Sequence, residues 1–139
     1  MLSIISLLKT YEPQGAHVNE NGVHQYGYVY EFRGNKCHIT FHVIRVNGMW
    51  FGASDCMCPE FGWGHPLMED VDDPYPSLYE LVYDLWSSTI RHLRSGFNFS
   101  PMGYANATIT SAEKEMKQML KLSNEEILKK FKVQSFFML

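Results

Sequence analysis

The stretch CHITFHVIRVNGMWFGASDCM, residues 37–57, decides the fold of this chain. At its centre stands Asn47-Gly48, a dipeptide that between apolar residues favours the type I′ turn of a two-residue β-hairpin. The turn determines which residues face each other across the hairpin, because the register can be counted outward from it. The stretch therefore predicts two antiparallel strands, at about 37–46 and 49–57.

A third strand is predicted before the hairpin. Arg33-Gly34-Asn35-Lys36 indicates another tight turn, which pairs a strand at about 23–32 with the first hairpin strand and sets Phe32 opposite Cys37. Side chains alternate between the two faces of a sheet, so this three-stranded meander has one apolar face that should be the core. Its members are Tyr26, Tyr28, Tyr30, Phe32, Cys37, Ile39, Phe41, Val43, Trp50, Cys56 and Cys58.

The opposite face is mixed, and its polar side chains are Glu31, His38, Thr40, His42 and Asp55. Two histidines and carboxylates suggest acid–base or metal chemistry. However, His38 and His42 are four residues apart on one strand, roughly 13 Å between Cα atoms, so they do not meet at one metal ion. Half-exposed polar positions on a strand explain this set adequately.

Three capping boxes, each a Ser or Thr followed three residues later by Glu, predict helices after the meander. They are Ser77 with Glu80 for a central helix at about 77–95, Thr110 with Glu113 for about 111–122, and Ser123 with Glu126 for about 124–134. The apolar residues 1–8 predict a short N-terminal helix. We therefore expect a single α+β domain over residues 1–139, with helices packed on the apolar face of the meander.

The bulk composition limits the function classes. With 45% hydrophobic residues, 19% charged residues and a net charge of −3, the chain is not disordered and has no general electrostatic attraction for nucleic acid or anionic membranes. No apolar run approaches the ~20 residues of a membrane span, and no export signal is evident. The odd number of cysteines then predicts a cytoplasmic protein with reduced thiols.

One candidate metal site combines Cys37, Cys56, Cys58 and His65, because thiolates and imidazole are the ligands that zinc favours. The hairpin register brings the three cysteines together. Against zinc, alternate residues of a strand lie roughly 6.6 Å apart at Cα, and free cysteine is often simply a buried hydrophobic residue. A disulfide between Cys37 and Cys58 would need oxidation, and a nucleophilic Cys56 or Cys58 would need access and a low pKa.

A candidate partner-binding surface lies between the last strand and the central helix, where aromatic residues precede an acidic run. The residues are Phe61, Trp63, His65, Met68, Glu69, Asp70, Asp72 and Asp73. Aromatic anchors beside a charged rim are typical of protein interfaces. The alternative is that Trp63 folds back over the core and that the acidic run is only solvated.

From the sequence we expect a non-enzymatic intracellular protein-binding module that needs no cofactor. A meander leading through a loop into a capped helix is a plan shared by small proteins of phages and mobile elements, so an inhibitor or adaptor of a host system is one concrete form. Zinc binding, structural or in a metal-dependent enzyme, is the first alternative. Nucleic-acid binding by C-terminal lysines is the second, through Lys114, Lys117, Lys121, Lys129, Lys130 and Lys132.

Overall fold

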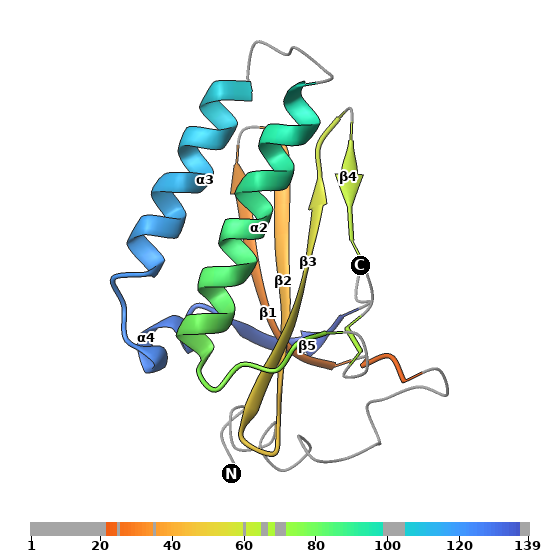
Figure 1. Cartoon of the computed structure of the whole chain (residues 1–139), viewed down its shortest axis with the longest axis vertical. Helices are drawn as coiled ribbons and strands as arrows, with labels where there is room; N and C mark the ends of the chain where they lie inside the picture. The colour runs from red at the N-terminus through yellow and green to blue at the C-terminus, as the bar shows by residue number, and fades with distance from the viewer. Residues whose placement is uncertain are drawn as a thin grey trace.

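The chain folds as α+β, with an antiparallel open sheet of five strands and three helices in the described residues. The computed structural model describes residues 22–24, 26–34, 36–59, 61–64, 67–68, 72–98 and 105–136. The sheet order is β4-β3-β2-β1-β5 (Figure 1). Its strands are β1 (Tyr26–Gly34), β2 (Cys37–Val46), β3 (Met49–Met57), β4 (Gly62–Trp63) and β5 (Lys132–Ser135), and the helices are α2 (Leu78–Asn98), α3 (Ala105–Met119) and α4 (Asn124–Leu128).

The β2–β3 hairpin has the predicted bounds and register. Val46 faces Met49 across the turn, and the pairing continues without interruption to His38 opposite Met57. Asn47 and Gly48 both have positive φ, 51° and 80°, as a type I′ turn requires. The turn dipeptide therefore sets the positions of all side chains along both strands.

The register between β1 and β2 differs from the prediction by two residues. Phe32 lies opposite Ile39 rather than Cys37, because Gly34 and Cys37 close the turn and only two residues separate them. Lys36 within that turn has a positive φ of 58°. A shift of two residues leaves each side chain on its predicted face, so the apolar face is preserved although β1 covers 26–34 instead of 23–32.

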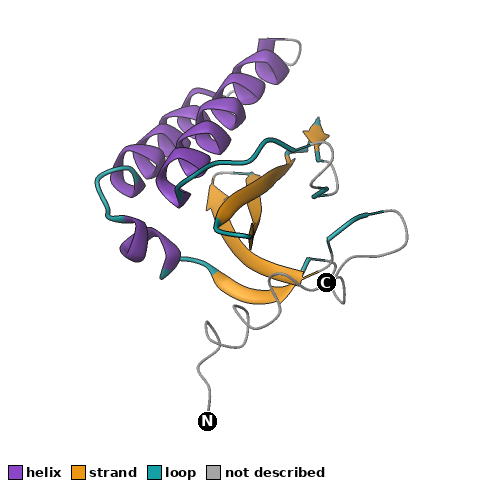
Figure 2. Ribbon diagram, turned by 60° about the horizontal axis from the view of Figure 1, so that its bottom comes forward, coloured by secondary structure: helices purple, strands orange, loops and turns teal. Residues whose placement is uncertain are grey.

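Helices α2 and α3 lie side by side on one face of the sheet (Figure 2). Apolar side chains of β1, β2 and β3 form the main core together with these helices, and Trp86 of α2 is fully buried in it. The indole ring of Trp86 meets Phe41 edge-on at 4.9 Å between ring centroids. Its Nε1 donates a hydrogen bond to Met119 Sδ of α3 at 3.3 Å, which satisfies the buried donor.

The predicted C-terminal helix at 124–134 is wrong in its second half. Helix α4 ends at Leu128, and the chain then forms β5, which pairs with β1 from Val29 opposite Lys132 to Tyr26 opposite Ser135. Hydrogen bonds spanning three residues end the helix, from Lys130 N to Ile127 O and from Phe131 N to Leu128 O. The edge of β1 that faces away from β2 carries backbone N–H and C=O groups that need hydrogen-bond partners. Pairing with these groups outweighs the helical spacing of the apolar residues in 124–134.

Other predicted boundaries also move. Helix α3 begins at Ala105 rather than near residue 111, so Thr110 lies inside it and caps nothing. The other two caps form: Ser77 Oγ accepts from Glu80 N, and Ser123 with Glu126 makes a complete capping box. The predicted N-terminal helix at residues 1–8 lies outside the described residues. None of the described helices is long and apolar enough to cross a membrane.

The face of the sheet opposite the helices carries a second, smaller apolar cluster. Its buried members are Ile44, Phe51, Ala53 and Leu67, with Val46, Met49 and Phe136 packed against them. Leu67 belongs to the segment after β4, and its carbonyl accepts a hydrogen bond from His24 N at 2.9 Å. This cluster covers part of the predicted mixed face.

Candidate functional site

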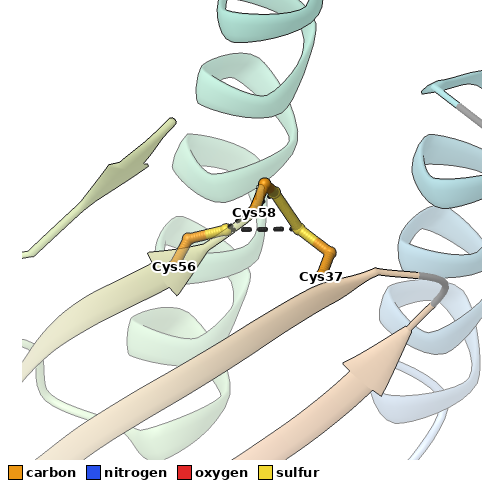
Figure 3. Close-up of a disulfide and its surroundings, with 3 residues drawn as sticks. All are labelled: Cys37, Cys56 and Cys58. Carbon is orange, nitrogen blue, oxygen red and sulfur yellow. Dashed lines mark hydrogen bonds between the residues drawn. A yellow bond between two sulfur atoms is a disulfide. The ribbon is translucent and has the colours of Figure 1, made fainter. Parts of the chain in front are cut away.

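Three cysteine sulfurs meet at one end of the hairpin, under helix α2 (Figure 3). Cys37 begins β2, Cys56 lies near the end of β3, and Cys58 follows that strand. The register counted from Asn47-Gly48 pairs Ile39 with Cys56. Two positions further along, the same register sets Cys37 opposite Cys58, so the three cysteines lie together. All three side chains are buried in the main core.

The sulfurs are close enough for covalent or metal chemistry. Cys37 and Cys58 form a disulfide, with 4.7 Å between their Cα atoms. Cys56 Sγ lies 3.5 Å from Cys37 Sγ and 3.8 Å from Cys58 Sγ. The expectation of reduced thiols was therefore wrong for Cys37 and Cys58, since the cross-strand register places their Cα atoms within the usual disulfide range.

Cys56 and Cys58 converge because β3 ends between them. The strand stops at Met57, and Cys58 N donates a hydrogen bond to Phe61 O at 2.8 Å, which reverses the chain toward β4. The separation of alternate residues in a regular strand, which counted against a common site, does not apply across this turn. His65, the predicted fourth ligand, lies outside the described residues.

Cys56 is a poor nucleophile in this setting. Burial raises the pKa of its thiol to about 12, so the thiol is protonated near pH 7. Reactive cysteines need the thiolate and access for a substrate, and a side chain 4% exposed offers neither. The geometry thus argues against the nucleophile interpretation and leaves disulfide or metal chemistry for the cluster.

The aromatic residues after the hairpin pack partly inward. Phe61 and Trp63 are half-buried, and their rings stack at 6.3 Å between centroids. Trp63 also stacks on His92 of α2 at 5.1 Å and approaches Ser54 Oγ with its Nε1 at 3.5 Å. Trp63 therefore packs against the core while part of its side chain stays exposed, and the partner-binding role of this segment stays a prediction.

The acidic part of the predicted loop divides into different roles. Asp72 closes a turn with Met68: Met68 N donates to Asp72 Oδ2 and Asp72 N donates to Met68 O, each at 2.9 Å. Asp73 is exposed. His65, Glu69 and Asp70 lie outside the described residues. Asp72 is thus a structural residue, and its replacement would change the loop as well as its charge.

Sequence reasoning missed two exposed features. Met57 is 71% exposed at the end of β3, although its alternation with Cys56 in the predicted strand already pointed it away from the core. His92 joins Trp63 only through the docking of α2, for which no short-range sequence signal exists. The sequence did place Phe61 and Trp63 near each other. They lie two residues apart, so their side chains share one face of an extended segment.

A pocket of about 350 Å³ lies between the hairpin turn and the start of helices α2 and α4. Arg45 lies over the ring of Trp50 with 5.4 Å to the ring centroid, and both residues line the pocket. The hairpin register could have indicated this pair, since it sets Arg45 opposite Trp50. Exposed Glu125 also lines the pocket, so its walls carry charges of both signs.

The polar residues of the mixed face form two separate pairs. His42 Nδ1 lies 3.7 Å from Asp55 Oδ2, and His38 Nε2 lies 3.9 Å from Glu31 Oε1. Burial lowers the pKa of His42, and the carboxylates of Asp55 and Glu31 oppose that shift. The only group of three or more metal-ligating side chains in the described ranges is the cysteine cluster.

Comparison of the chain with known proteins gives no match to a family model, to a curated protein or to a solved structure. The function must therefore be argued from the side chains themselves. Two features carry such an argument: the exposed Met57 with the half-buried rings of Phe61 and Trp63 at the β3–β4 edge, and the three buried sulfurs.

Proposed function

We propose that this protein is a non-enzymatic binding module that recognises a protein partner through the β3–β4 edge of its sheet. The contact surface, called here the edge patch, consists of Met57, Phe61, Trp63 and His92. The observation that carries the proposal is the exposure of both faces of this edge: Met57 is 71% exposed on one face, and the half-buried rings of Phe61 and Trp63 stack with the exposed His92 on the other. Methionine and aromatic residues are enriched in the centres of protein interfaces.

The two faces of the edge offer different contacts. Gly62 pairs with Met57 and Trp63 with Cys56, so Met57 and Trp63 project from opposite faces of the same short ribbon. Within the described residues β4 is the outermost strand on this side of the sheet. An extended segment of a partner that pairs with β4 would reach both side chains, which supports recognition by strand addition.

The rings of the edge patch are held in place before any partner arrives. Trp63 is fixed by its stacks on Phe61 and His92 and by its contact with Ser54 Oγ. Side chains that are already ordered lose little conformational entropy on binding, which favours affinity. Two polar side chains, His38 and Asp55, flank Met57 on the sheet. Polar residues of this kind surround the core of a protein interface.

The test replaces Met57 by glutamate, because this exposed side chain contributes little to folding and a buried interface charge is costly. The full chain and M57E are used to capture proteins from a lysate of the source organism, and captured proteins are quantified by mass spectrometry. We expect at least one partner to be enriched by the wild type and depleted about tenfold or more by M57E.

The matched control is Tyr83→Glu, since Tyr83 is 56% exposed on α2 and lies outside the edge patch. This variant should capture the same partner as the wild type. Thermal melting of all three proteins shows that they are equally folded. If M57E and the wild type capture the same proteins in the same amounts, the edge patch is not the binding surface and the proposal fails.

The nucleic-acid alternative stays a prediction. The six lysines of the C-terminal region are all exposed, and four glutamates are interspersed among them, at 113, 115, 125 and 126. Such mixed charge is typical of a solvated surface. If the lysines bind phosphates, retention of the protein on DNA or RNA should fall steeply as salt rises.

A further inference from the structure

The three buried sulfurs carry an inference that goes beyond partner binding and does not depend on it. We propose that the reduced protein binds one thiophilic d¹⁰ metal ion, Zn²⁺ or Cu⁺, through Cys37, Cys56 and Cys58. The three ligand atoms lie within 4.8 Å of one another and come from two adjacent strands and the turn that follows. Soft thiolates select these ions over Mg²⁺ or Ca²⁺.

The distances match those of a thiolate site. A zinc–sulfur bond of about 2.3 Å at a tetrahedral angle places two ligand sulfurs roughly 3.8 Å apart. Cys56 Sγ lies 3.5 Å from one partner sulfur and 3.8 Å from the other. Once the Cys37–Cys58 bond is opened, only those two sulfurs must separate for all three to contact one ion.

The surroundings of the sulfurs favour a structural site. The cysteines belong to the main core together with side chains of α2, and the neighbouring rings of Phe61 and Trp63 pack against that core. A dry shell protects the metal–sulfur bonds from exchange with water. Position also favours a site, since the ion would link β2 to the turn between β3 and β4, the part of the sheet with the shortest strand.

Metal binding and the disulfide exclude each other, because both use the sulfurs of Cys37 and Cys58. An external thiol reductant opens the disulfide: two R–SH groups are oxidised to R–S–S–R, and the two cysteines each gain one electron and one proton. Three cysteine thiols then release three protons to solvent as three sulfur–metal bonds form. Metal affinity should therefore appear only after reduction.

The experiment uses the full chain, reduced without oxygen and verified to carry three free thiols by alkylation and mass spectrometry. Zn²⁺ alone and Cu⁺ alone are titrated in competition with a chromogenic chelator. We expect one ion per chain, and X-ray absorption should show three sulfur neighbours at about 2.3 Å. A fourth, lighter neighbour would identify the zinc form, and three sulfurs alone would identify the copper form.

The informative variant is Cys56→Ser, which removes one ligand and should weaken binding at least about tenfold, since loss of an outer partner alone has that effect. Tyr83→Phe is the control, because Tyr83 is 56% exposed on α2 and belongs neither to the cysteine cluster nor to the edge patch, so metal binding should be unchanged. The absorption spectrum of the wild type tests the site even if the serine variant does not fold. Absence of stoichiometric binding, fewer than three sulfur neighbours, or equal binding before and after reduction would overturn the proposal.

Discussion

At His42, burial and charge act on one imidazole in opposite directions. Its side chain is 13% exposed and stacks on Phe136 at 4.5 Å between ring centroids, with the Asp55 carboxylate 3.7 Å from Nδ1. Burial is the largest effect and lowers the pKa below the ordinary value of 6.5. The strand pattern predicts a half-exposed polar side chain at this position. The stack on Phe136 could not be predicted, because it depends on where the chain runs after β5.

The lowered pKa makes stability depend on pH in one direction. Between the folded pKa and 6.5 the unfolded chain binds more protons, so the free energy of unfolding rises with pH there. The contribution of His42 is complete above about pH 6.5 and decreases below it. We expect urea midpoints measured from pH 5 to 7 to fall on acidification, and the fall to be smaller in His42→Phe.

Asp55→Asn provides an independent check on the same residue. Removing the carboxylate removes a charge that favours the imidazolium, so the pKa of His42 should move further down. An NMR titration of the ring protons measures it. A rise in the pKa, or none of the expected decrease, would show that Asp55 does not interact with His42.

At the scale of elements, the sequence predicts what is local and misses what depends on distant pairing. The β2–β3 hairpin follows residue by residue from Asn47-Gly48, because turn chemistry and side-chain alternation agree. The cysteine cluster is predictable for the same reason. By contrast, Ile127 and Phe131 have helical spacing, and β5 arises only because β1 lies beside it with backbone groups to pair.

The junction of β1 with its neighbours can be tested at Gly27. A Cβ atom here would lie 2.7 Å from Val43 O and 2.8 Å from Phe136 Cζ, so Gly27→Ala forces the backbone or the ring to move. We expect a loss of about 1–3 kcal/mol in the free energy of unfolding, the usual effect of overpacking. Gly34→Ala on the same strand is the control, because its nearest contact is the flexible end of Phe32 at 3.0 Å. Equal losses in both variants would contradict the tight packing at Gly27.

For the whole molecule, the helical layer and the sheet meet at Trp86, while the end of the sheet away from the hairpin turn is held by sulfur chemistry. The stack of Trp63 on His92 joins these two parts, since Trp63 belongs to β4 and His92 to α2. Its geometry could not be predicted from sequence, because it depends on how α2 docks on the sheet. The edge patch therefore depends on the integrity of the whole fold.

Covalent linkage of the sheet end should be measurable as global stability. The disulfide joins residues separated by 21 positions, and a loop of that size stabilises a folded chain by about 3 kcal/mol through the unfolded state. Urea unfolding of the oxidised and the reduced chain should differ by that amount. Adding Zn²⁺ or Cu⁺ to the reduced chain should restore about 2.7 kcal/mol at a hundredfold excess over Kd. In Cys56→Ser the oxidised form should remain more stable than the reduced form, because the disulfide needs only Cys37 and Cys58. The metal should restore little stability to the reduced variant, because the ion needs all three sulfurs.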